Sequence, residues 1–129
     1  MSIYKLSQRS QNNLRGVHQD LVQVVCLAIT FSEYDFVVIE GIRSLARQKA
    51  LIKEGKSKTL NSRHLTGHAV DIVPLVNGVI SWQDWSAFEA VSKVMKQAAQ
   101  QLGISINWGG DWASFRDGPH YELCREVYP

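Results

Sequence analysis

The chain has 129 residues, a length that suits one compact domain, and we expect residues 1–129 to form it. Hydrophobic residues make up 45% and charged residues 20%, so the protein can bury a core without a disulfide or a structural metal. The net charge of +2 is too small for a dedicated nucleic-acid binder, and no stretch approaches the roughly 18 apolar residues that span a bilayer. We therefore expect no nucleic-acid partner and no stable membrane association.

The first half of the chain predicts two helices separated by a strand. Over residues 10–31, apolar positions recur every three or four residues, and Ser10 can cap a helix there. Residues 36–40 read FVVIE, a β-branched run typical of a strand. A second helix is predicted over 45–54, between a capping serine and a closing glycine. Residues 56–68 are rich in Lys, Ser, Thr and Asn, which indicates a loop.

The second half predicts a sheet built around one long helix. Residues 69–76 indicate a strand interrupted by Pro74, and an Asn-Gly turn leads to a partner strand over 79–82. An amphipathic helix begins at Asp84 or Ser86 and ends at a glycine, residue 103. Two more strands are predicted over 104–108 and 120–124. Helices and hairpin-linked strands in this order predict an α+β fold with a mostly antiparallel central sheet and flanking helices.

Residues 62–71, SRHLTGHAVD, hold the first candidate metal ligands. Asp71 stands in an apolar strand, where a carboxylate is costly unless it is paired or bound to a metal. His64 precedes it by seven residues across a corner between loop and strand, so both side chains can converge on one ion. Asp71 could instead cap a turn beside a surface His64, or His64 and His68 could form a helical pair, although Gly67 argues against a helix.

Asp117 and His120, in the sequence DGPH, supply a second histidine and a further carboxylate. Catalytic zinc sites commonly use three protein ligands and leave the fourth position to water, and His64, Asp71 and His120 would complete such a set. Asp117 then remains available as a general base. The alternative is an ordinary turn, because Asp-Gly-Pro strongly favours one.

Arg43 follows the predicted strand 36–40, where its guanidinium could stabilise an oxyanion or hold a substrate carboxylate. A surface salt bridge is the alternative for this residue. Trp108, Trp112 and Tyr121 surround a Gly-Gly pair and could form one wall of a groove for an extended peptide or sugar. The alternative is that these aromatic residues belong to the core or its rim, and we expect the tryptophans at 82 and 85 to pack.

Together these motifs resemble the M15 zinc peptidase family. This family includes D-alanyl-D-alanine carboxypeptidases of the VanY type and the L-alanyl-D-glutamate endopeptidases of phage endolysins. The pattern S-x-H-x-x-G-x-A-x-D is present in full, G-x-R-S precedes it, and [DE]-x-x-H follows it. The matching residues are Ser62, His64, Gly67, Ala69 and Asp71; Gly41, Arg43 and Ser44, with Gln48 on the following helix; and Asp117 and His120.

The resemblance implies a Hedgehog/DD-peptidase-like fold that binds Zn²⁺ through His64, Asp71 and His120. It further implies that Asp117 is the catalytic base and that Arg43 assists the transition state. The candidate substrate-binding residues are Ser62, Gln48, Trp108 and Tyr121. His68 is interpreted as a solvated loop histidine.

The chain is short, its N-terminus lacks a signal-peptide core, and its base position is Asp rather than Glu; these features favour the phage endolysin branch. We expect a monomeric enzyme, made in the cytoplasm of a host bacterium, that cuts the L-Ala–D-Glu bond of the peptidoglycan stem peptide after release across the membrane. The alternatives are a D-alanyl-D-alanine carboxypeptidase used in wall remodelling, a noncatalytic zinc-containing binding module, and a phage tail subunit that penetrates the wall.

Overall fold

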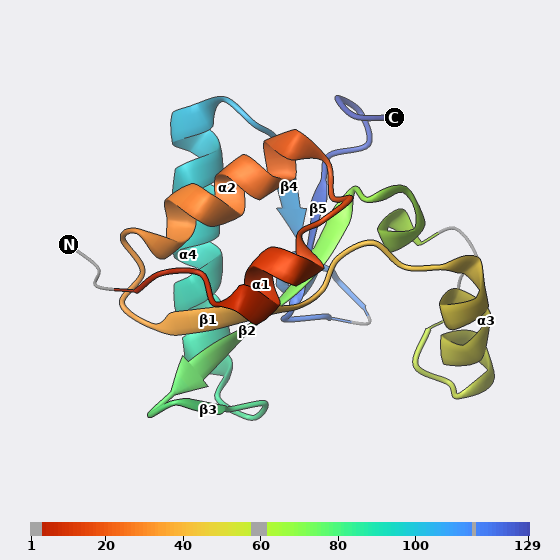
Figure 1. The fold of residues 1–129 in the computed structure, drawn as a ribbon, viewed down its shortest axis with the longest axis horizontal. Coiled ribbons are helices and arrows are strands. Elements are labelled where there is room, and N and C mark those ends of the chain that lie inside the picture. Colours follow the sequence, from red (N-terminus) through yellow and green to blue (C-terminus); the bar gives the residue numbers. More distant parts are fainter. Residues whose placement is uncertain (1–3, 58–61, 115) are drawn as a thin grey trace.

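The computed structural model describes residues 4–57, 62–114 and 116–129, and shows a twisted sheet flanked by helices (Figure 1). Helix α4 lies against the sheet and packs against α2, whereas α3 stands apart at one edge of the molecule. The helices are α1 Gln8–Asn13, α2 Gln19–Ile29, α3 Leu45–Lys53 and α4 Trp85–Leu102, with 3-10 turns η1 Arg63–Thr66 and η2 Gly109–Asp111. The strands are β1 Asp35–Glu40, β2 Ala69–Val76, β3 Val79–Ile80, β4 Ile106–Trp108 and β5 His120–Leu123.

The sheet has the strand order β1-β2-β5-β4, with β3 paired to β2, and every one of these pairings is antiparallel. The predicted α+β fold is therefore confirmed. Within the sheet, Asp71 on β2 lies opposite Glu40 on one side and His120 on the other. The register alone thus brings one predicted metal ligand beside another.

The core lies between the sheet and the pair α2 and α4. Leu21 on α2 and Met95 on α4 are fully buried, as are Ile72 on β2 and Leu123 on β5. Burying one such side chain stabilises the fold by about 1.5–3 kcal/mol. This layer leaves the opposite face of β2 and β5 free to carry polar groups.

The helix predicted over 10–31 is wrong in its extent, because the structure has two helices there. Gly16 has a φ of 83°, a left-handed conformation that ends the first helix and redirects the chain. Ser7, rather than Ser10, caps α1 by accepting a hydrogen bond from the Ser10 amide. The Ser10 hydroxyl is buried and accepts a hydrogen bond from the Val38 amide of β1 instead.

Other predicted elements hold with adjusted boundaries. Helices α3 and α4 begin after the capping residues Ser44 and Asp84, as expected. Strand β2 continues through Pro74, which sits opposite Phe36 of β1. Strand β3 stops at residue 80, and the loop predicted over 56–68 contains η1; its residues 58–61 lie outside the described part of the chain.

Gly67 ends η1 at a place where no larger residue fits. Its φ is 74°, and a Cβ added there would lie 2.6 Å from the Gly16 carbonyl oxygen. Gly103 has a similar φ of 70° but faces open space. We expect Gly103→Ala to lower the free energy of unfolding by about 1–2 kcal/mol through backbone strain, and Gly67→Ala to lower it by about 1–3 kcal/mol more through overlap. Urea unfolding of both variants measures the difference; equal losses would contradict the close approach.

Candidate metal centre and active-site cleft

Three elements bring His64, Asp71 and His120 to one point. His64 lies in η1, Asp71 in the middle of β2 and His120 at the start of β5. The Asp71 Oδ1 atom is 3.3 Å from His64 Nε2 and 3.5 Å from His120 Nδ1, and one ligand atom from each residue lies within 4.8 Å of the others. A tetrahedral ion with bonds of about 2.0–2.2 Å needs ligand atoms about 3.3–3.6 Å apart.

Two of these atoms are buried with no hydrogen-bond partner among the described residues. They are His64 Nε2 and Asp71 Oδ1, which face each other without making a hydrogen bond. The other ring nitrogen of His64, Nδ1, lies 2.8 Å from the Gly41 carbonyl oxygen and must donate to it. In the neutral ring, His64 Nε2 then carries a lone pair toward Asp71, and an unpartnered buried lone pair beside a carboxylate oxygen fits a bound cation.

Charge within the cluster shifts two pKa values in opposite directions. Burial alone would raise the pKa of Asp71, but the two histidines outweigh it and hold that pKa below its usual value. Burial alone would lower the pKa of His120, but Asp71 and Glu122 outweigh it and raise the pKa to about 9. Asp71 thus favours its carboxylate form, and its negative charge favours the protonated form of His120.

Asp117 lies at the edge of the same cluster. Its backbone amide donates to the Gly109 carbonyl, and its own carbonyl accepts from the His120 amide. A Cβ on Gly109 would lie 2.4 Å from the Asp117 carbonyl oxygen, so only glycine allows this approach. Burial, and then the negative charge of Asp71, raise the pKa of the Asp117 carboxyl above its usual value. That shift suits a group that must accept and return a proton.

The guanidinium of Arg43 lies next to Asp71 and is hydrogen-bonded to neighbouring side chains. Its Nε and Nη2 donate to both oxygens of Glu40 at 2.8 and 2.6 Å, and its Nη1 donates to Gln48 Oε1 at 2.7 Å. Its Nη2 also lies 3.6 Å from Asp71 Oδ2, and its Nη1 lies 3.5 Å from Ser62 Oγ. The guanidinium is therefore fixed in place, with one edge toward the carboxylate of Asp71.

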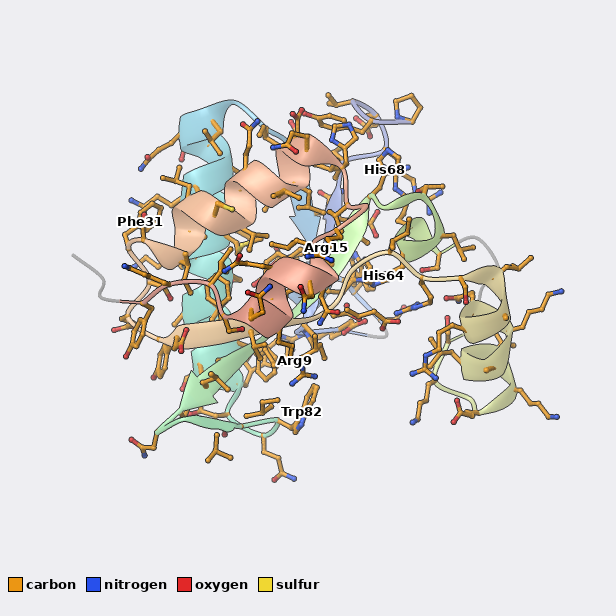
Figure 2. The ribbon with its side chains drawn as sticks, in the orientation of Figure 1. Arg9, Arg15, Phe31, His64, His68 and Trp82 are labelled. Atoms are coloured by element: carbon orange, nitrogen blue, oxygen red, sulfur yellow. The ribbon has the colours of Figure 1, made fainter. Side chains whose placement is uncertain are left out.

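An open cleft with a volume of about 940 Å³ contains the three candidate ligands, Asp117 and Arg43. Trp112 lines it with its ring centroid 5.1 Å from that of His120, and 38% of this tryptophan is exposed. Trp82, which we expected to pack, also lines the cleft and is 58% exposed. Figure 2 shows His64 between the sheet and α3, and Trp82 beside the loop that follows β3.

Two of the four predicted substrate-binding residues lie in the core, and those predictions are corrected. Trp108 and Tyr121 are 5% and 1% exposed, stand opposite each other on β4 and β5, and stack at 6.5 Å. Trp85 at the start of α4 stacks on the other side of this cluster, with its ring centroid 5.6 Å from that of Trp108.

The other two predicted substrate-binding residues, Gln48 and Ser62, differ in whether they reach the cleft. Gln48 is fully buried and contacts Arg43 rather than the cleft, whereas Ser62 lines the cleft. Sequence reasoning missed Glu122, which lines the cleft beside His120. The signal was present, since residues two apart on a strand share a face.

The chain matches the family described as phage L-alanyl-D-glutamate peptidase over residues 1–124. It belongs to this family. The L-alanyl-D-glutamate peptidase of Escherichia phage T5 is 38% identical over 128 residues, which cover 97% of this chain and 93% of that protein. The predicted membership of the phage peptidase branch, and with it the prediction of a peptidase, is confirmed.

Two solved structures resemble the fold. The L-Ala D-Glu endopeptidase ChiX of Serratia marcescens superposes with a TM-score of 0.92 at 47% identity, covering 98% of this chain and 94% of that one. The vancomycin-resistance D,D-dipeptidase VanXYg superposes with a TM-score of 0.54 at 16% identity, covering 83% and 50%. The second likeness shows a shared fold alone. Among the described residues, every helix is too short or too polar to cross a membrane.

Proposed function

We propose that this protein is a zinc-dependent endopeptidase that hydrolyses the L-Ala–D-Glu bond in the stem peptide of bacterial peptidoglycan. One observation carries the proposal: among the residues that the structure describes, His64 Nε2 and Asp71 Oδ1 are buried without hydrogen-bond partners, and they converge with His120 Nδ1 in the lining of an open cleft. The relatives at 38% and 47% identity are named for activity on this bond, and they match almost the whole chain.

The donor set supports zinc as the ion. The donor set is two imidazoles and one carboxylate in a cleft open to solvent, and both nitrogen-to-oxygen distances to Asp71 Oδ1, 3.3 and 3.5 Å, are close to tetrahedral spacing. Such a set is typical of catalytic zinc centres that hold three protein ligands. We assign His64, Asp71 and His120 as these ligands. When bound, the ion supplies a Lewis acid that polarises the scissile carbonyl and lowers the pKa of water.

Asp117 is assigned as the general base and acid. Its carboxylate takes a proton from the attacking water and then returns one to the leaving amine of D-Glu. The raised pKa of Asp117 brings the two protonation states closer in energy, so that the same group can do both. We assign Arg43 to hold the Asp71 carboxylate through Nη2 and to place positive charge where the carbonyl oxygen becomes an oxyanion.

The walls of the cleft fit an anionic peptide attached to a sugar. Trp82 and Trp112 offer exposed aromatic surface, and Lys56 and Arg125 place positive charge in the cleft lining. The stem peptide carries carboxylates beyond the scissile bond, and sugars stack on aromatic rings. The protein would thus act on the cell wall as a lytic enzyme, and we propose that it works as a monomer.

The zinc affinity of the protein is expected to depend on pH through His120. Zinc requires the neutral imidazole, and the raised pKa of about 9 means that a proton occupies this site at lower pH in the metal-free protein. The apparent affinity should therefore fall by up to about tenfold for each pH unit below that pKa, and binding should release a proton. Calorimetric zinc titrations in buffers of different ionisation enthalpy measure both; an affinity unchanged between neutral pH and mildly alkaline pH would contradict it.

The proposed function is tested by digesting purified peptidoglycan and identifying the new termini by mass spectrometry, with and without a chelator. We expect new L-Ala C-termini and D-Glu N-termini that vanish with chelator and return with zinc. Release of D-Ala alone would instead identify a carboxypeptidase. Stoichiometric zinc without any cleavage would identify a noncatalytic binding module.

A further inference from the structure

The two candidate histidine ligands are oriented by different kinds of acceptor. His64 Nδ1 is held by a neutral backbone carbonyl, that of Gly41. His120 Nε2 lies 2.8 Å from a carboxylate oxygen, Oε1 of Glu122. Glu122 lies in the cleft lining, and only 13% of its side chain is exposed.

The β5 strand places His120 and Glu122 together. They are two residues apart, so both side chains stand on the cleft face while Tyr121 and Leu123 point into the core. The second carboxylate oxygen of Glu122 lies 3.9 Å from Arg125 Nε. Glu122 therefore lies between His120 and the more exposed Arg125, and the strand sets its position relative to His120.

A carboxylate at this position selects one form of the imidazole. An ionised carboxylate only accepts hydrogen bonds, so the Nε2 atom of His120 must carry the hydrogen. In the neutral ring, the lone pair then belongs to Nδ1, the atom that points to Asp71 Oδ1 at 3.5 Å. Metal-binding histidines commonly donate their other N–H to a carboxylate, which fixes the ring and strengthens it as a ligand.

We propose that Glu122 is a positioning residue that fixes His120 as a metal ligand through Nδ1. This inference rests on the metal site of the proposed function, but not on the bond that is cut. Because its acceptor is charged, the tuning is stronger at His120 than at His64, whose acceptor is a neutral carbonyl.

The test compares zinc dissociation constants, measured by competition with a chromophoric chelator at one pH. Glu122→Ala should weaken zinc binding by about 10–100-fold. Glu122→Gln should weaken it less, because the amide oxygen can still accept the Nε2 hydrogen. Glu89→Gln, which makes the same change of charge at an exposed position of α4, should leave the affinity unchanged.

A second measurement, on the wild-type protein, is independent of any effect of substitution on folding. Long-range ¹⁵N–¹H correlation spectra of the zinc-loaded protein should show His120 protonated at Nε2, with Nδ1 shifted by the metal. A proton on Nδ1, or a folded Glu122→Ala variant that binds zinc within about twofold of wild type, would overturn the inference.

The outcomes separate this inference from the proposed function. A wild-type protein that binds zinc with the expected His120 tautomer but cuts no peptidoglycan would contradict the proposed function and leave the role of Glu122 intact. A wild-type protein that binds no zinc would overturn both. Cleavage with normal zinc affinity in folded Glu122→Ala would overturn only the positioning role.

Discussion

Replacing Asp117 with Asn should lower kcat by about 10²–10⁴-fold while the protein still binds one zinc ion per chain. The amide cannot take a proton from water, but it has almost the shape of the carboxylate and does not alter the three candidate ligands. The backbone contacts of Asp117 with Gly109 and His120 do not involve the side chain, so the loop should keep its structure. Steady-state kinetics on a defined stem peptide, with zinc content from the same sample, measure both quantities.

Asp111→Asn is the matched control for this substitution. Asp111 lies in the same loop region, is exposed, and pairs with Lys96 at 2.6 Å rather than lining the cleft. An exposed ion pair of this kind contributes little to the stability of the fold, so we expect Asp111→Asn to keep near wild-type activity. If Asp117→Asn kept kcat within about threefold of wild type, the role of general base would have to pass to another group.

Replacing His64 with Ala should remove both zinc binding and peptidase activity, whereas His68→Ala should change neither. His64 is 2% exposed and contributes one of the three converging ligand atoms. His68 lies four residues later, but its Nδ1 atom hydrogen-bonds Thr66 at 2.7 Å, and its ring contacts that of His18 at a tilt of 44°, with centroids 5.5 Å apart. Its ring is thus engaged by neighbours outside the metal cluster, which agrees with its interpretation as a loop histidine.

For both variants, His64→Ala and His68→Ala, we would measure the zinc content and the release of new peptide termini. Loss of zinc in both variants would mean that the segment containing η1, rather than one ligand, had been disturbed. Full zinc occupancy in His64→Ala would remove this residue from the metal site.

The sequence predicted the cluster of candidate ligands because strand pairing brings together residues that are far apart along the chain. Asp71 was recognised as a polar residue in an apolar strand, and the antiparallel pairing of β2 with β5 then places it opposite His120. The left-handed turn at Gly67 ends η1, which carries His64, just before β2 begins. A short motif was enough to predict this cluster, because the pairing of β2 with β5 supplies the remaining proximity.

The aromatic residues were assigned less well, and strand alternation explains why. His120 faces the cleft, so Tyr121 must face the core, and Trp108 lies opposite Tyr121 on β4. Both rings were therefore excluded from the cleft once the face of His120 was known. Trp82 follows the end of β3 and Trp112 follows η2, where no strand periodicity indicates which way a side chain points.

The environment of Arg43 could not be read from the sequence. Its position after β1 was clear, but its partners come from three places: Glu40 on the strand, Gln48 inside α3 and Asp71 on β2. A register shift in β1 between Val38 and Glu40 decides which side chains meet there.

The break between α1 and α2 was also not predictable, because helical periodicity over 10–31 does not reveal that Gly16 adopts a positive φ.

The central claim is that one ion, held by His64, Asp71 and His120, enables cleavage of the L-Ala–D-Glu bond. The most direct test is to strip the protein of metal, add zinc in small steps, and measure cleavage of a defined stem peptide at each step. Activity should rise from background, reach its plateau at one zinc per chain, and yield a peptide that begins with D-Glu. Full activity in the stripped protein, or a plateau of bound zinc without this product, would contradict the account.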